Sequence, residues 1–542
     1  MNNKVAFDST QWWRGANIYQ IYPRSFCDSV SDGTGDLKGI RSKLAYVASL
    51  GVEAIWISPF FKSPMADFGY DISDYREVDP MFGSLEDFES MLEEAHRVGL
   101  KVIIDQVLSH TSDQHAWFKE SRSSSSNPRS DWYVWADSKP DGSAPNNWLS
   151  LFGGQAWTWD SRRQQYYLHN FLSSQPDLNF HNPEVRQAQL ENAKFWLDLG
   201  VDGFRFDVVN FYYHDHRLTD NPPLTSGERR TLAVSSDNPY SRQRHKYDIT
   251  QVENLQFLSD IRRLLDRYND TVSIGEISDD SPLDTMAAYT SDGDKLNMAY
   301  TFDLLHTEFS ADYIRSVIRK TEASIGDGWP CWAASNHDVV RHNSRWGNEQ
   351  GADFAKMTLA LLMSLRGSVC LYQGDELGLP QANVPYESLM DPYGFPFWPE
   401  YKGRDGCRTP MPWNSSEGAG FSAATPWLPI PNEHRALSVE SQSADRDSTL
   451  DFSRRLIAWR KNQRALVCGE IELIDDDGDV VSWVRTFDGQ SILVVINTSE
   501  IEQRYKLKYR GELAATDLGF TVHIQGSDMT LPAFQVAFIE II

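Results

Sequence analysis

The feature that most constrains the fold is a repeated module, in which an amphipathic helical stretch ends at a glycine and a short apolar run follows. Four copies stand out: Leu50-Gly51 before AIWISP, Val98-Gly99 before VIIDQV, Leu199-Gly200 before GFRFD, and Arg366-Gly367 before VCLYQG. Short apolar runs that alternate with such helices are typical of parallel strands buried on both faces. The module therefore predicts an α/β fold.

Further apolar runs bring the number of predicted strands to eight: NIYQIY (17–22), VSIGE (272–276), AYTFD (299–303) and CWAASN (331–336). Eight strand-helix units predict a (β/α)8 TIM barrel, whose active site lies at the carboxyl ends of the strands. Ionisable residues gather at several of these ends, which agrees with a site there: Asp105, Asp207, Glu276, Asp303 and His337.

Two segments depart from the module and predict further domains. The long connection after the third strand predicts an inserted subdomain at 106–178, which leaves 1–105 and 179–464 as the barrel. Beyond 465 the apolar residues alternate with period two, as in SILVVIN, and this pattern predicts a C-terminal antiparallel β-sandwich domain at 465–542. A long polar loop at 211–250 follows the fourth strand and lies beside the predicted site.

Charge and cysteine content narrow the function classes. The chain has 51 Lys and Arg against 76 Asp and Glu, a net charge of −25, which disfavours nucleic acid and anionic membrane surfaces as partners. The five cysteines lack metal-ligand spacing and fit reduced thiols. The polar stretch 1–13 lacks the apolar core of a signal peptide, and no run of 18 apolar residues occurs. We expect a cytoplasmic protein.

Three carboxylates at the ends of different predicted strands are expected to converge: Asp207, Glu276 and Asp338. Converging acids suit cleavage of a glycosidic bond, in which one carboxylate attacks the sugar and another protonates the leaving oxygen. A divalent metal site is the alternative, although such sites usually add Lys or several His ligands.

Five segments, in chain order, resemble motifs of the α-amylase family (glycoside hydrolase family 13), and within it the bacterial α-glucosidase and oligo-1,6-glucosidase branch. They are DQVLSH (105–110), QPDLN (175–179), GFRFD (203–207), GEI (275–277) and NHD (336–338). The resemblance covers nearly the whole chain. It implies that Asp207 is the nucleophile, Glu276 the general acid/base, and Asp338 the carboxylate that grips sugar hydroxyls and stabilises the transition state.

Other residues of these motifs predict supporting roles. Arg205 lies two residues before Asp207 on a strand and points to the same face, so that its guanidinium can keep the nucleophile ionised. By resemblance, His110 and His337 hydrogen-bond hydroxyls of the sugar. If Asp207 and Glu276 lie about 5 to 5.5 Å apart, the reaction retains the anomeric configuration.

The segment DFGYDISDY at 67–75 resembles the exo-acting branch, in which Asp67 and Tyr70 receive the terminal glucose at the non-reducing end. Arg404, in GRDGCRTPMPW, resembles the partner that pairs with Asp67 and closes the pocket. Phe152 and Phe171 of the inserted subdomain are candidates for apolar walls against the sugar, although most phenylalanines of a chain lie in its core.

The Gly-rich stretch DSVSDGTGD at 28–36 spaces three aspartates regularly, which suits oxygen ligation of a hard cation. It resembles the calcium loop of the oligo-1,6-glucosidase branch and implies a structural Ca²⁺, or Mg²⁺, held by Asp28, Val30, Asp32, Thr34 and Asp36. Val30 departs from the pattern, because a side-chain ligand often stands there. No organic cofactor is expected, since glycosyl transfer between oxygens needs none.

These observations predict an exo-acting α-glucosidase that acts on small oligosaccharides and transfers glucose to sugar or alcohol acceptors. The linkage preference stays open. By resemblance, Val208 after the nucleophile favours α-1,6 cleavage, whereas the 211–250 loop resembles enzymes that prefer short α-1,4 substrates. A sucrose- or trehalose-forming isomerase of the same family is one alternative. The other is a non-catalytic binding protein on this fold.

Overall fold

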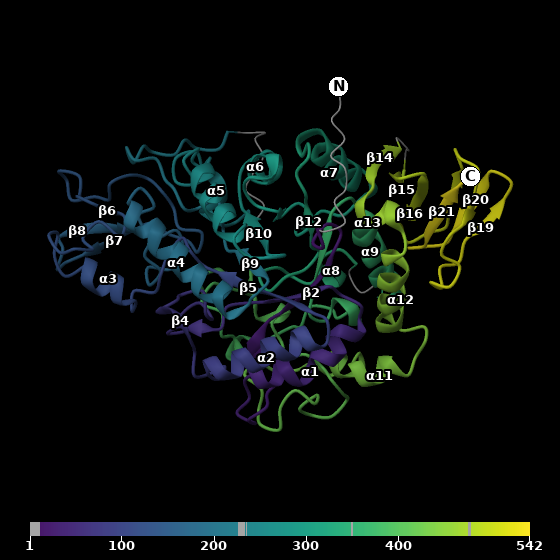
Figure 1. The fold of residues 1–542 in the computed structure, drawn as a ribbon, viewed down its shortest axis with the longest axis horizontal. Helices are drawn as coiled ribbons and strands as arrows, with labels where there is room; N and C mark the ends of the chain where they lie inside the picture. The colour runs from purple at the N-terminus through teal and green to yellow at the C-terminus, as the bar shows by residue number, and fades with distance from the viewer. Residues whose placement is uncertain (1–10, 226–233, 235, 348–350, 475–477) are drawn as a thin grey trace.

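The computed structural model describes residues 11–225, 234, 236–347, 351–474 and 478–542, so that 226–233 and 235 of the predicted 211–250 loop lie outside the described residues. At its centre are eight parallel strands (Figure 1). They are β1 (Asn17–Ile21), β2 (Ala54–Ile57), β5 (Lys101–Gln106), β9 (Gly203–Phe206), β10 (Val272–Ile277), β11 (Met298–Thr301), β12 (Cys331–Trp332) and β13 (Ser368–Tyr372).

The eight-stranded sheet closes on itself. Its strands pair in the order β11-β10-β9-β5-β2-β1-β13-β12. An isolated parallel bridge between Ala299 and Pro330 joins the two ends of this order. Each strand matches one of the apolar runs in the sequence, and the predicted (β/α)8 barrel is confirmed.

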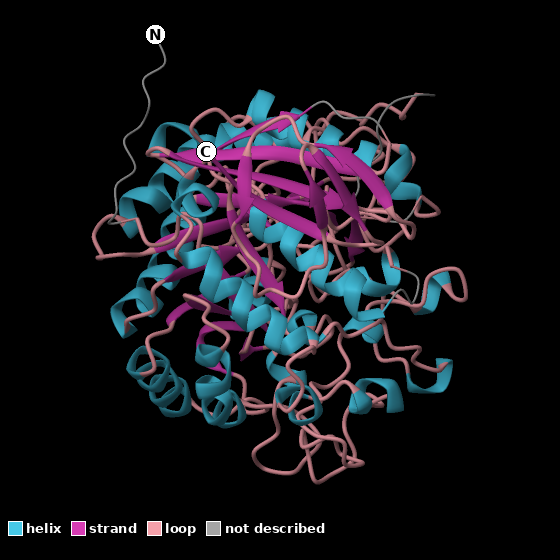
Figure 2. Ribbon diagram, turned by 90° about the vertical axis from the view of Figure 1, so that its right-hand side faces the viewer, coloured by secondary structure: helices cyan, strands magenta, loops and turns pink. Residues whose placement is uncertain are grey.

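Helices alternate with the barrel strands along the chain, and Figure 2 shows helices on several sides of the strands, with strands near the C-terminus toward the viewer. The longer ones are α1 (Leu37–Ser49), α2 (Leu85–Arg97), α4 (Pro183–Leu199), α5 (Asn254–Leu265), α6 (Pro282–Thr290), α7 (Ala311–Ser324), α9 (Gly351–Ser364) and α12 (Thr449–Lys461). The shorter ones are α3 (Ala116–Ser121), α8 (His342–Arg345), α10 (Asn432–Ala436), α11 (Val439–Ser443) and α13 (Arg464–Cys468).

Local sequence signals set the ends of these helices. Ser84 and Asp87 form a reciprocal capping box at the start of α2, as their spacing predicts. Gly200 ends α4 in the left-handed conformation, with φ of 101°, and the chain turns there toward β9. Phe88 and Leu92 of α2 are buried against the barrel core. Capping thus sets the ends of α2 and α4, and the apolar face of α2 packs it onto the sheet.

A small antiparallel sheet lies within the predicted inserted region. It contains β6 (Trp135–Ala136), β7 (Trp157–Asp160) and β8 (Gln165–Leu168), with β8 in the middle. The short pair β3 (Phe61–Lys62) and β4 (Asp74–Val78) precedes it in the chain. In Figure 1 the inserted sheet lies at one end of the molecule and the C-terminal strands lie at the other, with the barrel between them.

The C-terminal region contains two antiparallel sheets. The first comprises β14 (Glu470–Ile474), β15 (Val480–Phe487), β16 (Gln490–Asn497), β21 (Val536–Ile541) and β18 (Gly511–Leu513), and the second comprises β17 (Gln503–Lys506), β20 (Asp528–Leu531) and β19 (His523–Gln525).

Alternate residues of the C-terminal strands pack in two directions. Val481 and Trp483 belong to the core cluster that they share with the barrel. Val484 and Leu493 instead pack with Met529 of the second sheet, so that the two sheets form a sandwich. The predicted β-sandwich is confirmed, while the exact domain boundaries stay predictions.

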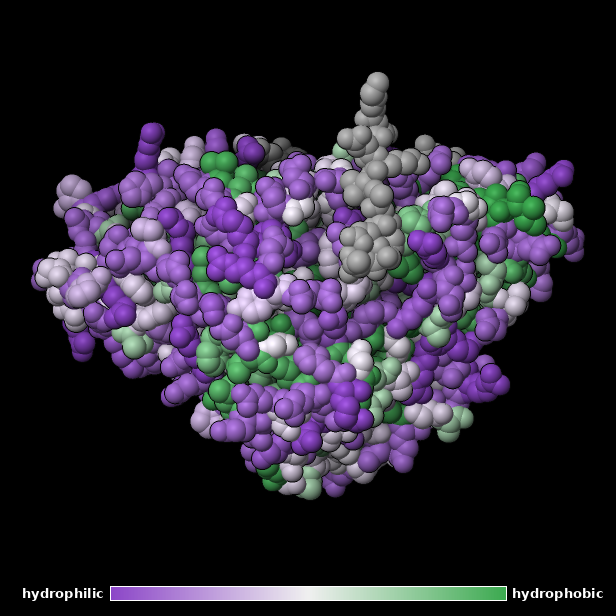
Figure 3. All heavy atoms as spheres, viewed as in Figure 1, coloured by the Kyte–Doolittle hydropathy of each residue, from purple (hydrophilic) through white to green (hydrophobic). Residues whose placement is uncertain are grey.

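On the face shown in Figure 3, polar residues predominate and apolar residues gather in separate patches. In the part of the chain that the structure describes, no helix combines the length and the apolar character needed to cross a bilayer.

Candidate active site

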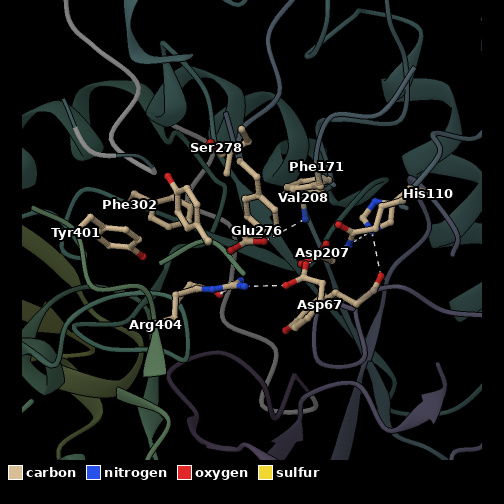
Figure 4. Close-up of a pocket in the computed structure, with 16 residues that line it drawn as sticks. Asp67, His110, Phe171, Asp207, Val208, Glu276, Ser278, Phe302, Tyr401 and Arg404 are labelled. Carbon is tan, nitrogen blue, oxygen red and sulfur yellow. Dashed lines mark hydrogen bonds and ion pairs between the residues drawn. The ribbon is translucent and has the colours of Figure 1, made fainter. Parts of the chain in front are cut away.

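The carboxyl ends of the barrel strands surround a pocket (Figure 4). Ten of the residues predicted from the sequence line it: Asp67, Tyr70, His110, Phe152, Phe171, Asp207, Val208, Glu276, Asp338 and Arg404. Arg205 and His337 are fully buried and contact these residues from behind. The structure therefore brings the predicted catalytic and sugar-binding residues together in one place.

One guanidinium joins the two central carboxylates. Arg205 projects from β9, and its Nη1 lies 2.6 Å from Oδ1 of Asp207. Its Nη2 lies 2.7 Å from Oε2 of Glu276, at the end of β10. A second carboxylate, Asp105 on β5, also accepts from Nη1 at 2.8 Å. A buried cation surrounded by three acids fixes where each carboxylate points.

The two central carboxylates differ in their pKa values. Burial raises the pKa of Glu276 to about 8, with neighbouring Asp207 and Asp338 adding to the rise and Arg205 opposing it. Burial also raises the pKa of Asp207, to about 7, although the same guanidinium opposes this rise. Near neutral pH, Glu276 is therefore the group that holds a proton, and Asp207 is the stronger candidate for an ionised nucleophile.

Val208 adopts an unusual backbone conformation between these acids. Its φ is +33°, in the left-handed region that a β-branched residue rarely enters. Its backbone N–H donates to Oε2 of Glu276 at 3.1 Å, and its side chain lines the pocket. Strained backbone of this kind persists where the surroundings determine it, and here it aims an amide at Glu276.

The third carboxylate, Asp338, lies among cations. Nη1 of Arg404 and Nη2 of Arg408 lie 3.1 and 3.0 Å from its Oδ1. The Nε2 of His337 lies 3.1 Å from Oδ2. Burial opposes ionisation of Asp338, but these neighbours outweigh it and lower its pKa below the usual range. Asp338 is therefore a permanent anion at the pocket wall.

Arg404 also closes one end of the pocket. Its Nη2 contacts Oδ1 of Asp67 at 2.7 Å, the predicted pair (Figure 4). The same nitrogen lies 2.7 Å from Oδ1 of Asp391, a residue that the sequence analysis missed. Asp67 is 3% exposed and accepts a further hydrogen bond from Gln175 at 3.1 Å. Asp67 and Arg404 thus form a buried ion pair in the pocket wall.

His110 and Tyr70 are predicted sugar contacts that the structure places on one side of the pocket. The hydroxyl of Tyr70 pairs with Nε2 of His337 and donates to Asp105 at 3.1 Å. Nε2 of His110 lies 3.1 Å from the carbonyl of Tyr70. Burial lowers the pKa of His110 to about 4, so the ring is neutral and hydrogen-bonds without adding charge.

Aromatic and apolar side chains form the remaining walls. Phe152 and Phe171 of the inserted region are there as predicted. Further lining residues were not predicted: Leu151, Gln175, Ser278, Phe302, Tyr393 and Tyr401. Gln175 opens the QPDLN motif, and Phe302 lies in the AYTFD run, so local signals existed for both. Tyr393 and Tyr401 come from a stretch without periodicity, which gave no such signal.

In the loop predicted to hold a cation, the aspartates accept hydrogen bonds from backbone N–H groups. Asp28 accepts backbone N–H groups of Val30 and Gly33 at 2.9 and 2.8 Å. Asp36 caps α1 by accepting from the N–H of Gly39 at 2.7 Å.

Asp32 and Val30 are two further residues of the predicted cation site. Asp32 accepts the N–H of Thr34 at 2.8 Å, and the side chain of Val30 is 61% exposed. Across the described ranges, no three His, Cys, Asp or Glu side chains are grouped as a metal would require. Asp28, Asp32 and Asp36 each accept at least one backbone N–H group in this structure. The structural cation stays a prediction, which a fall in melting temperature on chelation would support.

Comparisons with known proteins show the family of this chain. The model of the α-amylase catalytic domain matches residues 20–469. The chain belongs to the α-amylase family. It is 51% identical to a probable α-glucosidase of Rhizobium meliloti, over 97% of this chain and 96% of that protein. It is 37% identical to an oligo-1,6-glucosidase of Parageobacillus thermoglucosidasius, over 92% of each chain.

Solved structures of this family superimpose closely. An α-glucosyl transfer enzyme aligns with a TM-score of 0.97 and 55% identity, over 98% of this chain and all of that one. The trehalulose synthase of Pseudomonas mesoacidophila aligns with a TM-score of 0.89 and 33% identity, over 98% and 99% of the chains. Close relatives of one fold therefore differ in the reaction that their names describe.

Proposed function

We propose that this glycoside hydrolase is a retaining, exo-acting α-glucosidase that releases terminal glucose from short α-glucosides by double displacement. The observation that carries the proposal is Arg205, which contacts both Asp207 and Glu276. Because both carboxylates contact the same guanidinium, they lie close together, as the two acids of a retaining enzyme do. This close spacing leaves no room for a water molecule between the nucleophile and the sugar.

In the first step, an oxygen of Asp207 attacks C1 of the bound glucose as the bond from C1 to the glycosidic oxygen breaks. Glu276 gives its proton to that oxygen, and the alcohol leaves. In the second step, the carboxylate of Glu276 takes a proton from water, and the water oxygen displaces Asp207 from C1. The raised pKa of Glu276, about 8, supports its role as the acid near neutral pH.

The remaining residues support binding of one terminal glucose. Asp67 and Arg404 seal the pocket end, where their charges can accept from and donate to sugar hydroxyls. Asp338, held as an anion by Arg404 and Arg408, attracts the positive charge that develops on the sugar ring. A sealed end favours exo cleavage, because an internal unit of a long chain cannot reach Asp207.

Transfer of glucose to sugar or alcohol acceptors competes with hydrolysis in this proposal. Phe302, Tyr393 and Tyr401 line the pocket with apolar surface, which favours an organic hydroxyl compound over water as the attacking group. The likeness to a solved α-glucosyl transfer enzyme supports the same conclusion. In that case Glu276 would take its proton from the acceptor hydroxyl, and the acceptor would replace water as the attacking group.

The linkage preference is proposed from the residue that follows the nucleophile. We infer activity on maltose-sized substrates, with isomaltose as a competing substrate. Val208 lines the pocket next to the nucleophile, so the size and polarity of its side chain affect how the leaving group fits. The similarity to both an α-glucosidase and an oligo-1,6-glucosidase supports keeping the two linkages open.

Two other functions compete with this one. An isomerase that converts sucrose or forms trehalose is favoured by the likeness to a trehalulose synthase. A non-catalytic binding protein has less support, because Asp207, Glu276 and Asp338 all line the pocket.

Proton NMR on separate incubations with maltose, isomaltose, sucrose and trehalose tests the proposal. We expect initial release of α-glucose from maltose or isomaltose, and the ratio of the two rates measures the linkage preference. Interconversion of disaccharides without net glucose release would assign the isomerase function instead. No reaction with any of the four sugars would contradict both.

A further inference from the structure

Tyr300 lies directly beside Glu276 inside the barrel. Strands β10 and β11 pair in parallel, and their register sets Tyr300 opposite Glu276. The side chain is 3% exposed, and its ring centroid lies 6.2 Å from that of Trp56. Packing therefore fixes the ring, and with it the position of the hydroxyl.

The partners of this hydroxyl determine the direction of its proton. Nε and Nη2 of Arg205 lie 3.1 and 2.7 Å from the oxygen. A guanidinium has no acceptor, so Arg205 donates both hydrogen bonds and the phenol oxygen accepts them. The single proton of Tyr300 is then left for Oε1 of Glu276, 3.1 Å away. Burial raises the pKa of Tyr300 well above its ordinary value, which keeps that proton in place.

The other oxygen of Glu276 has donors as well. Oε2 accepts from Nη2 of Arg205 at 2.7 Å and from the N–H of Val208 at 3.1 Å. Donors on both oxygens fix the rotation of the carboxyl group. They also favour its ionised form over the protonated one.

We propose that Tyr300 is a positioning residue for Glu276, which orients the carboxyl toward the glycosidic oxygen and stabilises the carboxylate that remains once the proton has been given away. This inference rests on the proposed function of Glu276 as general acid/base. Tyr300 itself gains and loses no proton. Its hydrogen bond strengthens as the proton moves from Glu276 to the leaving oxygen and charge appears on Oε1.

Loss of this hydroxyl has two consequences. Without the donor, the carboxylate of Glu276 is less stable, so its pKa rises further above its ordinary value. A weaker and less well oriented acid also slows departure of a poor leaving group, such as the second glucose of maltose. A good leaving group, such as 4-nitrophenolate, needs less protonation and is affected less.

The Tyr300→Phe variant tests both consequences, because it keeps the ring and its packing. We expect the alkaline limb of kcat/KM against pH to move up by about one pH unit. We also expect kcat/KM on maltose to fall by roughly tenfold, with a smaller fall on 4-nitrophenyl α-glucoside. Tyr289→Phe is the matched control, since Tyr289 is equally buried on α6 and its hydroxyl accepts from Asn254.

An unchanged alkaline limb, with both substrates slowed equally, would overturn the inference. If Tyr300→Phe fails to fold, 3-fluorotyrosine at this position keeps the shape and makes the phenol a stronger donor. The alkaline limb should then move down, and an unmoved limb contradicts the proposal. Wild-type protein that cleaves neither substrate would contradict the proposed function instead, so the two failures are distinguishable.

Discussion

Arg404 holds Asp391 more tightly than it holds either of its partners in the pocket. The carboxylate of Asp391 accepts from Nη2 at 2.7 Å, from Nε at 3.0 Å and from the backbone N–H of Arg404 at 2.7 Å. Asp67 and Asp338 each contact the same guanidinium through one nitrogen. Asp391 therefore orients Arg404 toward two residues that line the pocket.

Asp391→Asn is expected to lower the free energy of unfolding by about 2 kcal/mol, because it removes a buried charge-assisted pair. Burial opposes ionisation, but Arg404 lowers the pKa of Asp391 to about 2. A depressed pKa contributes stability above the unfolded value of about 4 and loses it as pH falls toward the folded value. The difference between wild type and variant should therefore be full above pH 4 and shrink toward pH 2.

Denaturant unfolding at several pH values measures that difference. Asp517→Asn serves as the control, because Asp517 is exposed and should show no such trend. A difference that stays constant down to pH 2 would mean that the charge of Asp391 does not stabilise the fold.

Asp207→Asn is expected to abolish turnover, because the amide cannot form the covalent bond to C1. The loss in kcat on maltose should exceed roughly 100-fold, with the melting temperature little changed. Retention of more than about a percent of activity, beside a fully active Asp517→Asn control, would contradict the role of Asp207 as nucleophile.

Glu276→Gln is expected to lose activity in a way that added azide restores. Azide needs no general base, so it can displace Asp207 from C1 of the β-glucosyl enzyme and give an α-glucosyl azide. An aryl α-glucoside with a good leaving group forms that intermediate without acid help. Product analysis by NMR checks the outcome, and a folded variant that yields no azide product rules against the acid/base role.

The pH dependence of kcat/KM should be bell-shaped, with its optimum between about pH 7 and pH 8. Burial raises the pKa of Asp207 to about 7, so activity falls below that value as the nucleophile takes up a proton. Burial raises the pKa of Glu276 to about 8, so activity falls above it as the acid loses its proton. Initial rates on maltose measure both limbs, and an optimum below pH 5 would contradict this order.

Val208→Thr tests the linkage preference. The two side chains have nearly the same shape, so the substitution changes polarity at the pocket wall with little change in packing. We expect the ratio of isomaltose to maltose hydrolysis to fall, in line with the selector role that resemblance implies for this position. The ratio of kcat/KM values measures it, and an unchanged ratio would assign the preference to other lining residues.

The sequence predicted the parts of the molecule that local patterns determine. Each barrel strand is an apolar run, and the acids Asp207 and Glu276 follow directly at strand ends, so their convergence follows from the barrel itself. Asp391 and Tyr393 come from a stretch without regular periodicity, and only long-range packing brings them to the pocket.

Two other features could not be predicted from the spacing of residues in the sequence, because they depend on strand register and on side-chain orientation. The contact of Tyr300 with Glu276 depends on the register between β10 and β11, which apolar runs leave undetermined. The regular spacing of aspartates in the 28–36 loop indicated a cation site. It did not show that Asp28 and Asp36 also accept hydrogen bonds from backbone amides.

The left-handed backbone of Val208 bears on directed evolution of this enzyme. A β-branched residue at φ of +33° stores strain, of about 1–3 kcal/mol, that glycine would release. Val208→Gly would release this strain, but it would also remove a buried side chain that packs with Phe171 and Phe211 and loosen the amide that meets Glu276. Improvement of this enzyme therefore requires that survival on heating and turnover be screened on the same clones.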